Sequence, residues 1–534
     1  MYIYELHVFN SFSTDSIIFS MPKTQKESLF RLIKSLSKSE KRQFKLYVNR
    51  LVSNVDTKFI ALFDLMDKMT VYDEQKIANS KIVKREQLSN VKSHLYKQIL
   101  ISLRISISPT NKRLQLREQF DYVYILYNKG LYEQSLQMLQ RVKAQAVKLD
   151  ERTTEFQAIE FEKAIQTQYL SKTNFDYVHE IANQSIQIAS HNEVTAKLSS
   201  LSLLLYAKNV HYGYVKNDKE FKEVTAFFES HITEIDLETA GFSESFWYYK
   251  SYLLYSILVQ DLLSAYKFAN KWVELFFISP NMIELHPVFF IRGHQHLFEI
   301  LYLLKYMSKF KLALERFEVA LAQSSFPKNH NISPYIFMGR YNNKINFHFL
   351  EGTFDEAIPL IPEVLHGVIQ HADQLDQHHI MVLYYKIACI YFGAGNYLKC
   401  IEYLQFIIAD KTLRVHQDLM CFSRVLNVVA HYDAGLDYEL ETQVKQTYKF
   451  LLKMDELQSV QKEMIRFMRS LTDIYPNELK QAFRKLHASL KHFENDPYEK
   501  RSFLYLDILS WLESKIENRS IGEVIREKAS SLMR

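Results

Sequence analysis

Histidine is the residue type in this chain whose clustering could support metal chemistry. His286, His294 and His296 lie close together in the sequence, flanked by Glu284 and Glu299. Imidazole and carboxylate groups are common ligands of zinc. On a helix, however, residues two positions apart point about 200° away from each other. His294 and His296 could share a metal only across a break in the helix, so we expect polar or buried histidines here.

The other residues that could do chemistry show no functional pattern. His371, His378 and His379 offer one pair seven residues apart but no obvious carboxylate partner. The three cysteines have spacings that fit neither zinc nor a disulfide framework, so we expect core residues in a reducing compartment. The chain lacks a Gly-rich phosphate loop, a Gly-x-Ser-x-Gly elbow and a His-Glu-x-x-His motif. We therefore expect a non-enzymatic protein without cofactor or metal.

The composition favours helices throughout the chain. Of 534 residues only 11 are Gly and 10 are Pro, whereas 47% are hydrophobic and 14% are aromatic. Few positions break secondary structure, so we expect an all-α fold. The most apolar stretch, residues 246–263, contains Lys250 and Gln260, and no membrane span is expected. Residues 1–20 lack the basic start and apolar middle of a signal peptide, so we expect a cytoplasmic protein.

A turn-and-aromatic pattern recurs along the chain at nearly constant spacing. Gly130-Leu131-Tyr132 and Gly395-Asn396-Tyr397 are two examples. The turn positions are residues 130, 173, 219, 260, 308, 352, 395 and 435, at intervals of 43, 46, 41, 48, 44, 43 and 40 residues. A period of this size indicates a repeat array, in which each unit buries its apolar face by stacking on its neighbours. We expect each turn to join two helices.

The repeating units resemble the tetratricopeptide repeat. The seventh unit, residues 381–411, has that repeat's order of large, aliphatic, small and aromatic residues around the turn at Gly395: Tyr384, Ile387, Ala388, Tyr391, Tyr397, Cys400, Leu404 and Ile407. The family's unit has about 34 residues, whereas the units here are longer and more degenerate. The resemblance implies an α-α superhelix, a TPR-like solenoid preceded by a small helical N-terminal domain. Residues 26–50 also resemble uncharacterised bacterial helical-repeat proteins, a resemblance that assigns no activity.

Four regions follow from these patterns. Residues 1–20 are interpreted as an extension outside the fold, and residues 21–105 as a basic helical domain. A Ser-, Thr- and Pro-rich boundary follows at residues 106–111. Residues 114–475 would form an array of about eight helical hairpins, and residues 476–534 would supply helices that cap its end.

The resemblance also implies a binding surface. In a tetratricopeptide superhelix the first helix of each unit lines the concave groove, where aromatic, amide and basic side chains suit an extended peptide. By position, the groove candidates are Arg117, Phe120, Tyr124, Tyr127, Asn128, Trp247, Lys250, Gln295, Phe298, Tyr302, Lys305, Asn342, Asn346 and Tyr385. For each aromatic residue the alternative is a place in the core. This interpretation makes the protein an interaction scaffold or adaptor that binds a peptide or protein segment.

The N-terminal region suggests a different partner. Residues 21–105 carry 18 Lys and Arg against 8 Asp and Glu, a net charge of +10, whereas the whole chain has +5. The basic residues that could contact a polyanion are Lys81, Lys84, Arg85, Lys92, Lys97 and Arg104. The alternative function is a transcriptional or nucleic-acid-associated regulator with a TPR-like sensor array. A solvated helix face would carry the same charge, and a self-associating structural protein is a third interpretation.

Overall fold

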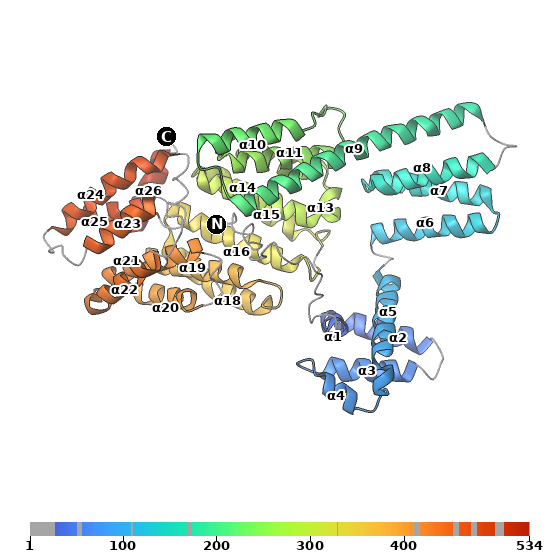
Figure 1. Ribbon diagram of the computed structural model, residues 1–534, viewed down its shortest axis with the longest axis horizontal. Coiled ribbons are helices and arrows are strands. Elements are labelled where there is room, and N and C mark those ends of the chain that lie inside the picture. Colours follow the sequence, from blue (N-terminus) through green and yellow to red (C-terminus); the bar gives the residue numbers. More distant parts are fainter. Residues whose placement is uncertain are drawn as a thin grey trace. The chain divides into compact units, whose positions relative to one another are not determined.

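The structure is a computed structural model. It describes residues 27–50, 56–107, 111–168, 174–327, 329–410, 417–451, 459–470, 478–496 and 507–532. Within these ranges every regular element is a helix, which confirms the predicted all-α class (Figure 1). The extension at residues 1–20 and the turn at residue 173 lie outside the described residues.

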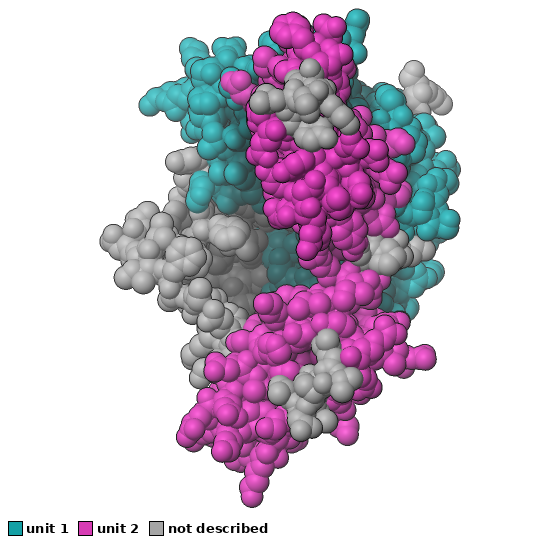
Figure 2. Space-filling model, turned by 90° about the vertical axis from the view of Figure 1, so that its right-hand side faces the viewer, with its two compact units in different colours: residues 1–12, 194–534 teal, residues 13–193 magenta. Residues whose placement is uncertain are grey.

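The chain divides into two compact units, which Figure 2 colours separately. The described residues up to 193 form what we call the first unit, which is magenta and labelled unit 2 in Figure 2, and those from 194 onward form the second unit, which is teal and labelled unit 1 there. The division falls within α9 (Phe175–Tyr212), a single helix of 38 residues. The boundary expected near residues 106–111 lies inside the first unit, between α5 and α6, and stays a prediction.

The first unit opens with a group of helices that share their own core. They are α1 (Ser28–Ser35), α2 (Lys38–Arg50), α3 (Asp56–Lys68), α4 (Glu74–Asn79) and α5 (Leu88–Ile107). Ser37 caps the start of α2, because its hydroxyl accepts the Glu40 N–H (3.2 Å) while its own N–H donates to the Glu40 carboxylate (2.7 Å). Ile33, Phe63 and Ile99 are fully buried, so α1, α3 and α5 pack together.

The remainder of the first unit is a set of antiparallel helices. These are α6 (Lys112–Asn128), α7 (Tyr132–Lys148), α8 (Arg152–Gln168) and the first part of α9. Helix α6 packs on α7 and α7 packs on α8, and Ile159 of α8 packs on Ile181 and Ile188 of α9. Leu139 and Val142 on α7 are fully buried, as is Ile165 on α8, so α7 and α8 supply much of the core.

The second unit continues the series. After the end of α9 come α10 (Asp218–His231), α11 (Phe242–Leu258), α12 (Leu262–Ile278), α13 (Asn281–Leu285), α14 (Pro287–Leu303), α15 (Met307–Ala322), α16 (Ser333–Glu351), α17 (Phe354–Ala357) and α18 (Ile361–Gln370). Then follow α19 (Gln377–Gly393), α20 (Tyr397–Ile408), α21 (Gln417–Asp433), α22 (Asp437–Leu451), α23 (Ser459–Ser470), α24 (Leu479–Lys491), α25 (Ile508–Glu517) and α26 (Ile521–Leu532). Sequence neighbours such as α11 and α12, or α19 and α20, bury their apolar faces on each other.

The periodic turns are largely confirmed. The glycines at positions 130, 352, 395 and 435 and the glutamine at 260 all adopt left-handed backbone angles between two helices, with φ from +60° to +76°. Two predicted turns are wrong, because Lys219 lies inside α10 and Ser308 lies inside α15. The reversal before α15 falls instead at Lys305, where φ is +55°. The reversal before α10 begins at Gly213, where φ is +72°, so the predicted position was six residues too late; the reversal before α15 has no glycine to mark it.

The last two helices contact parts of the second unit that are distant in sequence. On α25, the Trp511 indole N–H donates to the Asp433 carboxylate at the end of α21 (3.1 Å). On α26, the Arg526 guanidinium donates to the main-chain oxygen of Gly352 after α16 (3.3 Å). The chain therefore folds its final hairpin back onto the ends of earlier ones.

Candidate functional site

Three of the predicted groove residues meet on one face of the first unit. Phe120, Tyr124 and Tyr127 on α6 converge on Phe161 of α8. The Tyr124 ring stacks on Phe161 with centroids 4.4 Å apart, and the rings of Tyr127 and Phe120 meet it at 5.2 Å and 6.4 Å. We call these four residues the aromatic platform. Helical spacing explains the grouping, because residues three and four positions apart share a face.

The aromatic platform is open to solvent. The Tyr124 side chain is 46% exposed, and the other three rings are half-buried. Tyr127 is held in place because its hydroxyl donates to the Gln168 carboxamide oxygen (2.8 Å). Arg117 and Asn128 are exposed on the same helix.

A buried ionic network supports the platform from behind. Glu162, next to Phe161 on α8, is fully buried and accepts hydrogen bonds from Lys143 (2.5 Å) and Gln140 (2.6 Å). It also accepts from the Tyr177 hydroxyl on α9. Burial, followed by this bond to a carboxylate, raises the pKa of Tyr177. The network fixes the orientation of α8, and with it the position of Phe161.

Phe161 is the platform residue that sequence reasoning missed. The turn predicted near residue 173 has no glycine, so the first helix of that unit could not be placed from the sequence. Phe161 lies three positions after Ala158 and four before Ile165, both buried, so helical spacing alone would have placed it in the buried stripe of α8, whereas the structure leaves it half-buried.

A second pair of groove candidates lies in the second unit. The Lys250 amino group lies 4.6 Å from the centroid of the Trp247 ring and 5.9 Å from that of Phe289. Among the described residues no carboxylate lies within ion-pair distance of Lys250, and burial lowers its pKa to about 8. Cation–π contacts with these rings take the place of a counter-ion. Phe289, on α14, was not predicted.

Five groove candidates lie in the core of the second unit instead of on a groove. Gln295, Phe298, Asn342, Asn346 and Tyr385 are each at most 7% exposed. Phe298 faces the aromatic interior between α12, α14 and α15, because long units pack large side chains between their helices. Their assignment to a peptide groove is not supported by their burial in this structure.

The two asparagines accept hydrogen bonds from a buried lysine of the same chain. The Lys386 amino group, fully buried on α19, donates to the main-chain oxygen of Asn342 (3.0 Å) and to the side-chain oxygen of Asn346 (2.7 Å).

Two further groove candidates lie on α14 and in the turn that follows it. Tyr302 is half-buried, and burial raises its pKa, whereas Lys305 is exposed in the turn before α15.

The histidines and cysteines singled out in the sequence are buried or hydrogen-bonded within the fold. His294 is buried, and its Nδ1 lies 3.0 Å from the Phe290 main-chain oxygen. His379 does have a carboxylate partner, Asp376, at 2.7 Å, which the sequence reading overlooked. Burial raises the pKa of the Cys389 thiol to about 12, so this thiol stays protonated and unreactive. The described part of the chain contains no cluster of His, Cys, Asp or Glu that could hold a metal.

The six basic candidates of the N-terminal region fall into two groups. Lys92 is engaged by the Tyr72 hydroxyl (2.9 Å) and by Glu74 (3.5 Å), and Arg104 pairs with Asp121 (2.8 Å). The other four are exposed and form no ion pair with any described residue: Lys81, Lys84, Arg85 and Lys97. Only this second group is available to a polyanion without breaking an existing contact.

Comparisons with known proteins add no family. The chain matches no protein-family model, no curated protein and no solved structure. Among the helices described, none has the length and apolar character needed to cross a membrane. Functional inference therefore rests on the side chains of the structure itself.

Proposed function

We propose that this protein is a non-enzymatic interaction scaffold whose TPR-like array binds a peptide or protein segment. The aromatic platform carries the proposal. Phe120, Tyr124, Tyr127 and Phe161 present large, stiff rings that are partly open to solvent, although such rings are usually buried. Rings of this kind supply contact area at low cost in side-chain entropy and dominate many recognition surfaces.

The surroundings of the platform suit a peptide. Arg117 can pair with a carboxylate, and Asn128 offers both a donor and an acceptor to a peptide backbone. A peptide laid across α6 and α8 would cover the half-exposed rings. Display of fixed side chains on a rigid array would then be the mechanism, with no covalent step.

Peptide selection tests this proposal directly. The full chain is immobilised, a random peptide library is selected against it, and the dissociation constant of the best peptide is measured by fluorescence anisotropy. We expect Tyr124→Ala and Phe161→Ala each to weaken binding at least tenfold, about 1.4 kcal/mol or more. Tyr438→Ala, which truncates a tyrosine 94% exposed on α22, is the matched control and should leave binding unchanged. The proposal fails if no peptide is enriched, or if the platform variants and the control bind alike.

Nucleic-acid binding is the second candidate function, and the four unpaired basic residues favour it. Lys81, Lys84 and Arg85 lie within five positions of one another, and Lys97 lies on the following helix. Dispersed cations of this kind suit phosphate contacts better than base recognition. A regulator of this type would use the first helices for nucleic acid and the array for a partner.

Salt dependence tests this second candidate. Labelled duplex and single-stranded DNA are titrated with the full chain at about 50 and 200 mM salt, because released counter-ions make phosphate binding steeply salt-dependent. The combined change Lys81→Gln, Lys84→Gln and Arg85→Gln should reduce the salt slope, whereas Lys129→Gln, an exposed lysine in the turn after α6, should not. Absence of binding at low salt excludes this function.

A further inference from the structure

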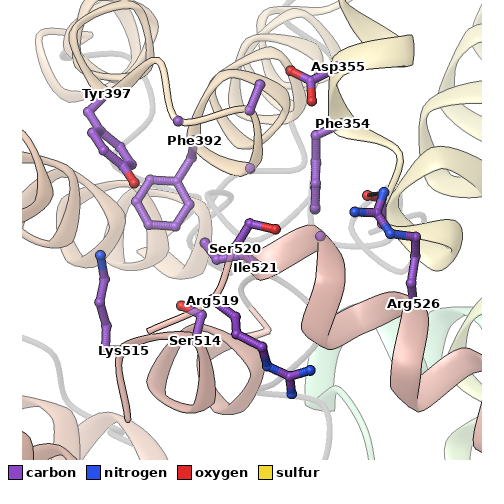
Figure 3. A pocket seen from close by; sticks show the side chains of 15 residues that line it. Phe354, Asp355, Phe392, Tyr397, Ser514, Lys515, Arg519, Ser520, Ile521 and Arg526 are labelled. Carbon is purple, nitrogen blue, oxygen red and sulfur yellow. Dashed lines mark hydrogen bonds between the residues drawn. The ribbon is translucent and has the colours of Figure 1, made fainter. Parts of the chain in front are cut away.

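A small pocket lies in the second unit where three inter-helix turns meet (Figure 3). The turns follow α16, join α19 to α20 and join α25 to α26. The cavity has a volume of about 200 Å³. This is room for several water molecules or for one small chemical group.

Glycines let the walls of the pocket come close together. A Cβ atom built on Gly352 would lie 2.5 Å from the main-chain oxygen of Gly522, and one built on Gly522 would lie 2.6 Å from the oxygen of Gly352. Gly393 lies directly under the Phe354 ring, where a Cβ would come within 2.2 Å of a ring carbon. The pocket is therefore framed by closely packed backbone and by a ring that cannot move far.

Hydrogen-bond donors line one end of the pocket. In Figure 3 the amino end of Lys515 and the hydroxyl of Tyr397 point toward each other. The Lys515 ammonium forms an ion pair with the buried carboxylate of Asp433 (2.7 Å). This contact occupies only one of the three N–H groups of Lys515. The Tyr397 hydroxyl makes no hydrogen bond with any described residue. Both groups therefore keep donor capacity for a ligand.

The rest of the lining is also rich in donors. Arg526 donates to the Gly352 main-chain oxygen and forms no ion pair with the described carboxylates. Asp355 is the single carboxylate among the residues that line the pocket. Arg519 contributes little, since its guanidinium points away from Tyr397 and Lys515 and pairs with Glu517 and Glu527. The side chains that line the pocket thus offer more hydrogen-bond donors than acceptors, although Asp433 balances the charge of Lys515.

We propose that this pocket binds a small ligand through an oxyanion, either a carboxylate or a phosphate, held between Lys515 and Tyr397. An oxyanion has only acceptor oxygens, which match the N–H groups of an ammonium and the O–H of a phenol. Asp433 fixes the ammonium in place from behind. The ligand would bridge the α25–α26 turn and the α19–α20 turn, so its binding would stabilise the docking of the last two helices. The inference is independent of the aromatic platform, which lies in the other unit.

Thermal unfolding of the full chain tests the proposal. The midpoint temperature is measured against rising potassium phosphate or potassium acetate, with potassium chloride holding the ionic strength constant. We expect at least one of the two anions to raise the midpoint in a saturable way, because a ligand that binds only the folded state stabilises it. A response to phosphate alone would identify a phosphorylated ligand, and a response to acetate would identify a carboxylate.

Removal of a single oxygen separates site binding from a general salt effect. Tyr397→Phe should lower the apparent affinity at least fivefold, and Tyr391→Phe, the same change on α19 outside the pocket, should not. An equal response in wild type and Tyr397→Phe would mean that the anion acts by exclusion from the surface, and would overturn the proposal. Absence of any response to either anion, together with absence of heat in isothermal titration calorimetry, would overturn it too.

Discussion

At the scale of single residues, the least expected feature is the buried lysine on α19. Lys386 is fully buried, and its two hydrogen bonds go to neutral oxygens of Asn342 and Asn346. A neutral amine has two N–H groups, so two acceptors satisfy it, whereas an ammonium would leave one N–H unpaired in the core. Burial lowers the pKa of Lys386 well below its ordinary value. We therefore infer that this side chain is neutral in the folded protein.

A neutral Lys386 makes stability depend on pH. Between its folded pKa and its ordinary value near 10.5, the unfolded chain binds a proton that the folded chain lacks, so the free energy of unfolding should rise with pH. One such proton gives a slope of about 1.4 kcal/mol per pH unit. We expect a positive slope in urea unfolding in the alkaline range just below pH 10.5 and expect Lys386→Met to reduce it. Lys311→Met, at an exposed lysine on α15, should keep it, and an unchanged slope in Lys386→Met would contradict the inference.

His294 should make the stability of the fold depend on pH in the acidic range. Burial lowers its pKa to about 4, below the ordinary value of 6.5. As pH falls from 6.5 toward 4, the unfolded chain gains a proton that the folded chain cannot take, so stability should fall over this window. The loss is at most about 3 kcal/mol. Urea unfolding at pH 7 and pH 5 should show a smaller difference for His294→Leu than for wild type, whereas the exposed-site control His366→Leu should behave as wild type.

Residue-level prediction from the sequence succeeded where helical spacing alone decides the outcome. Phe120, Tyr124 and Tyr127 share a face of α6 because of their spacing, and the structure brings them together. Asn342 and Asn346 share a face of α16 for the same reason, yet that face is covered by α19 and its lysine. Spacing predicts which side chains lie on one face of a helix. It does not predict what the next helix places against that face.

At the scale of helices, glycines decided how well boundaries could be predicted. The turns marked by Gly130, Gly352 and Gly395 were located correctly, since a left-handed turn favours glycine. The sequence analysis did not predict that residues 175–212 form the single helix α9. These residues include neither Gly nor Pro, which would interrupt a helix. The periodicity had suggested two helices there. The absence of any helix breaker was the stronger signal.

The contact between α26 and the turn after α16 gives a prediction at this scale. Gly→Ala in a helix interior normally stabilises the helix by about 1 kcal/mol, and the gain is smaller at Gly522, the second residue of α26. At Gly522, however, the new Cβ would lie 2.6 Å from the main-chain oxygen of Gly352, so α26 must shift. We expect Gly522→Ala to destabilise the docking of α26 by about 1–3 kcal/mol. Amide hydrogen exchange in α26 should accelerate in this variant and stay slow in Ser530→Ala, an exposed site on the same helix.

At the scale of the whole molecule, the chain is a succession of helices that bury their faces on sequence neighbours. Such arrays gain stability as a sum of local interfaces, so damage to one interface stays local. Composition predicted the helical class, because Gly and Pro are scarce, but it could not predict that compactness divides the chain inside α9. That division depends on which faces of α9 are covered. The first part of α9 packs on α8, and its second part packs on α10 and α11.

A cavity made in one interface should destabilise only the helices around it. Leu139 is fully buried on α7, and Leu139→Ala should cost about 2–5 kcal/mol. We expect faster amide exchange in α6–α8 and unchanged exchange in α19–α22. Leu404→Ala, at an equally buried leucine on α20, should produce the reverse pattern. Uniform acceleration along the chain in either variant would show that the array unfolds as one cooperative block.

The left-handed turns have a consequence for engineering. Asp150, Gln260, Lys305 and Asn518 hold positive φ angles without being glycine. A side chain in that conformation costs about 1 kcal/mol relative to glycine. Gln260 recovers part of that cost through a bond from its amide to the Val215 oxygen (3.0 Å), but Lys305 has no such bond among the described residues. Lys305→Gly is thus an accessible route to a more stable variant, and sequence change at that position could tune thermal stability without altering the aromatic platform or the pocket.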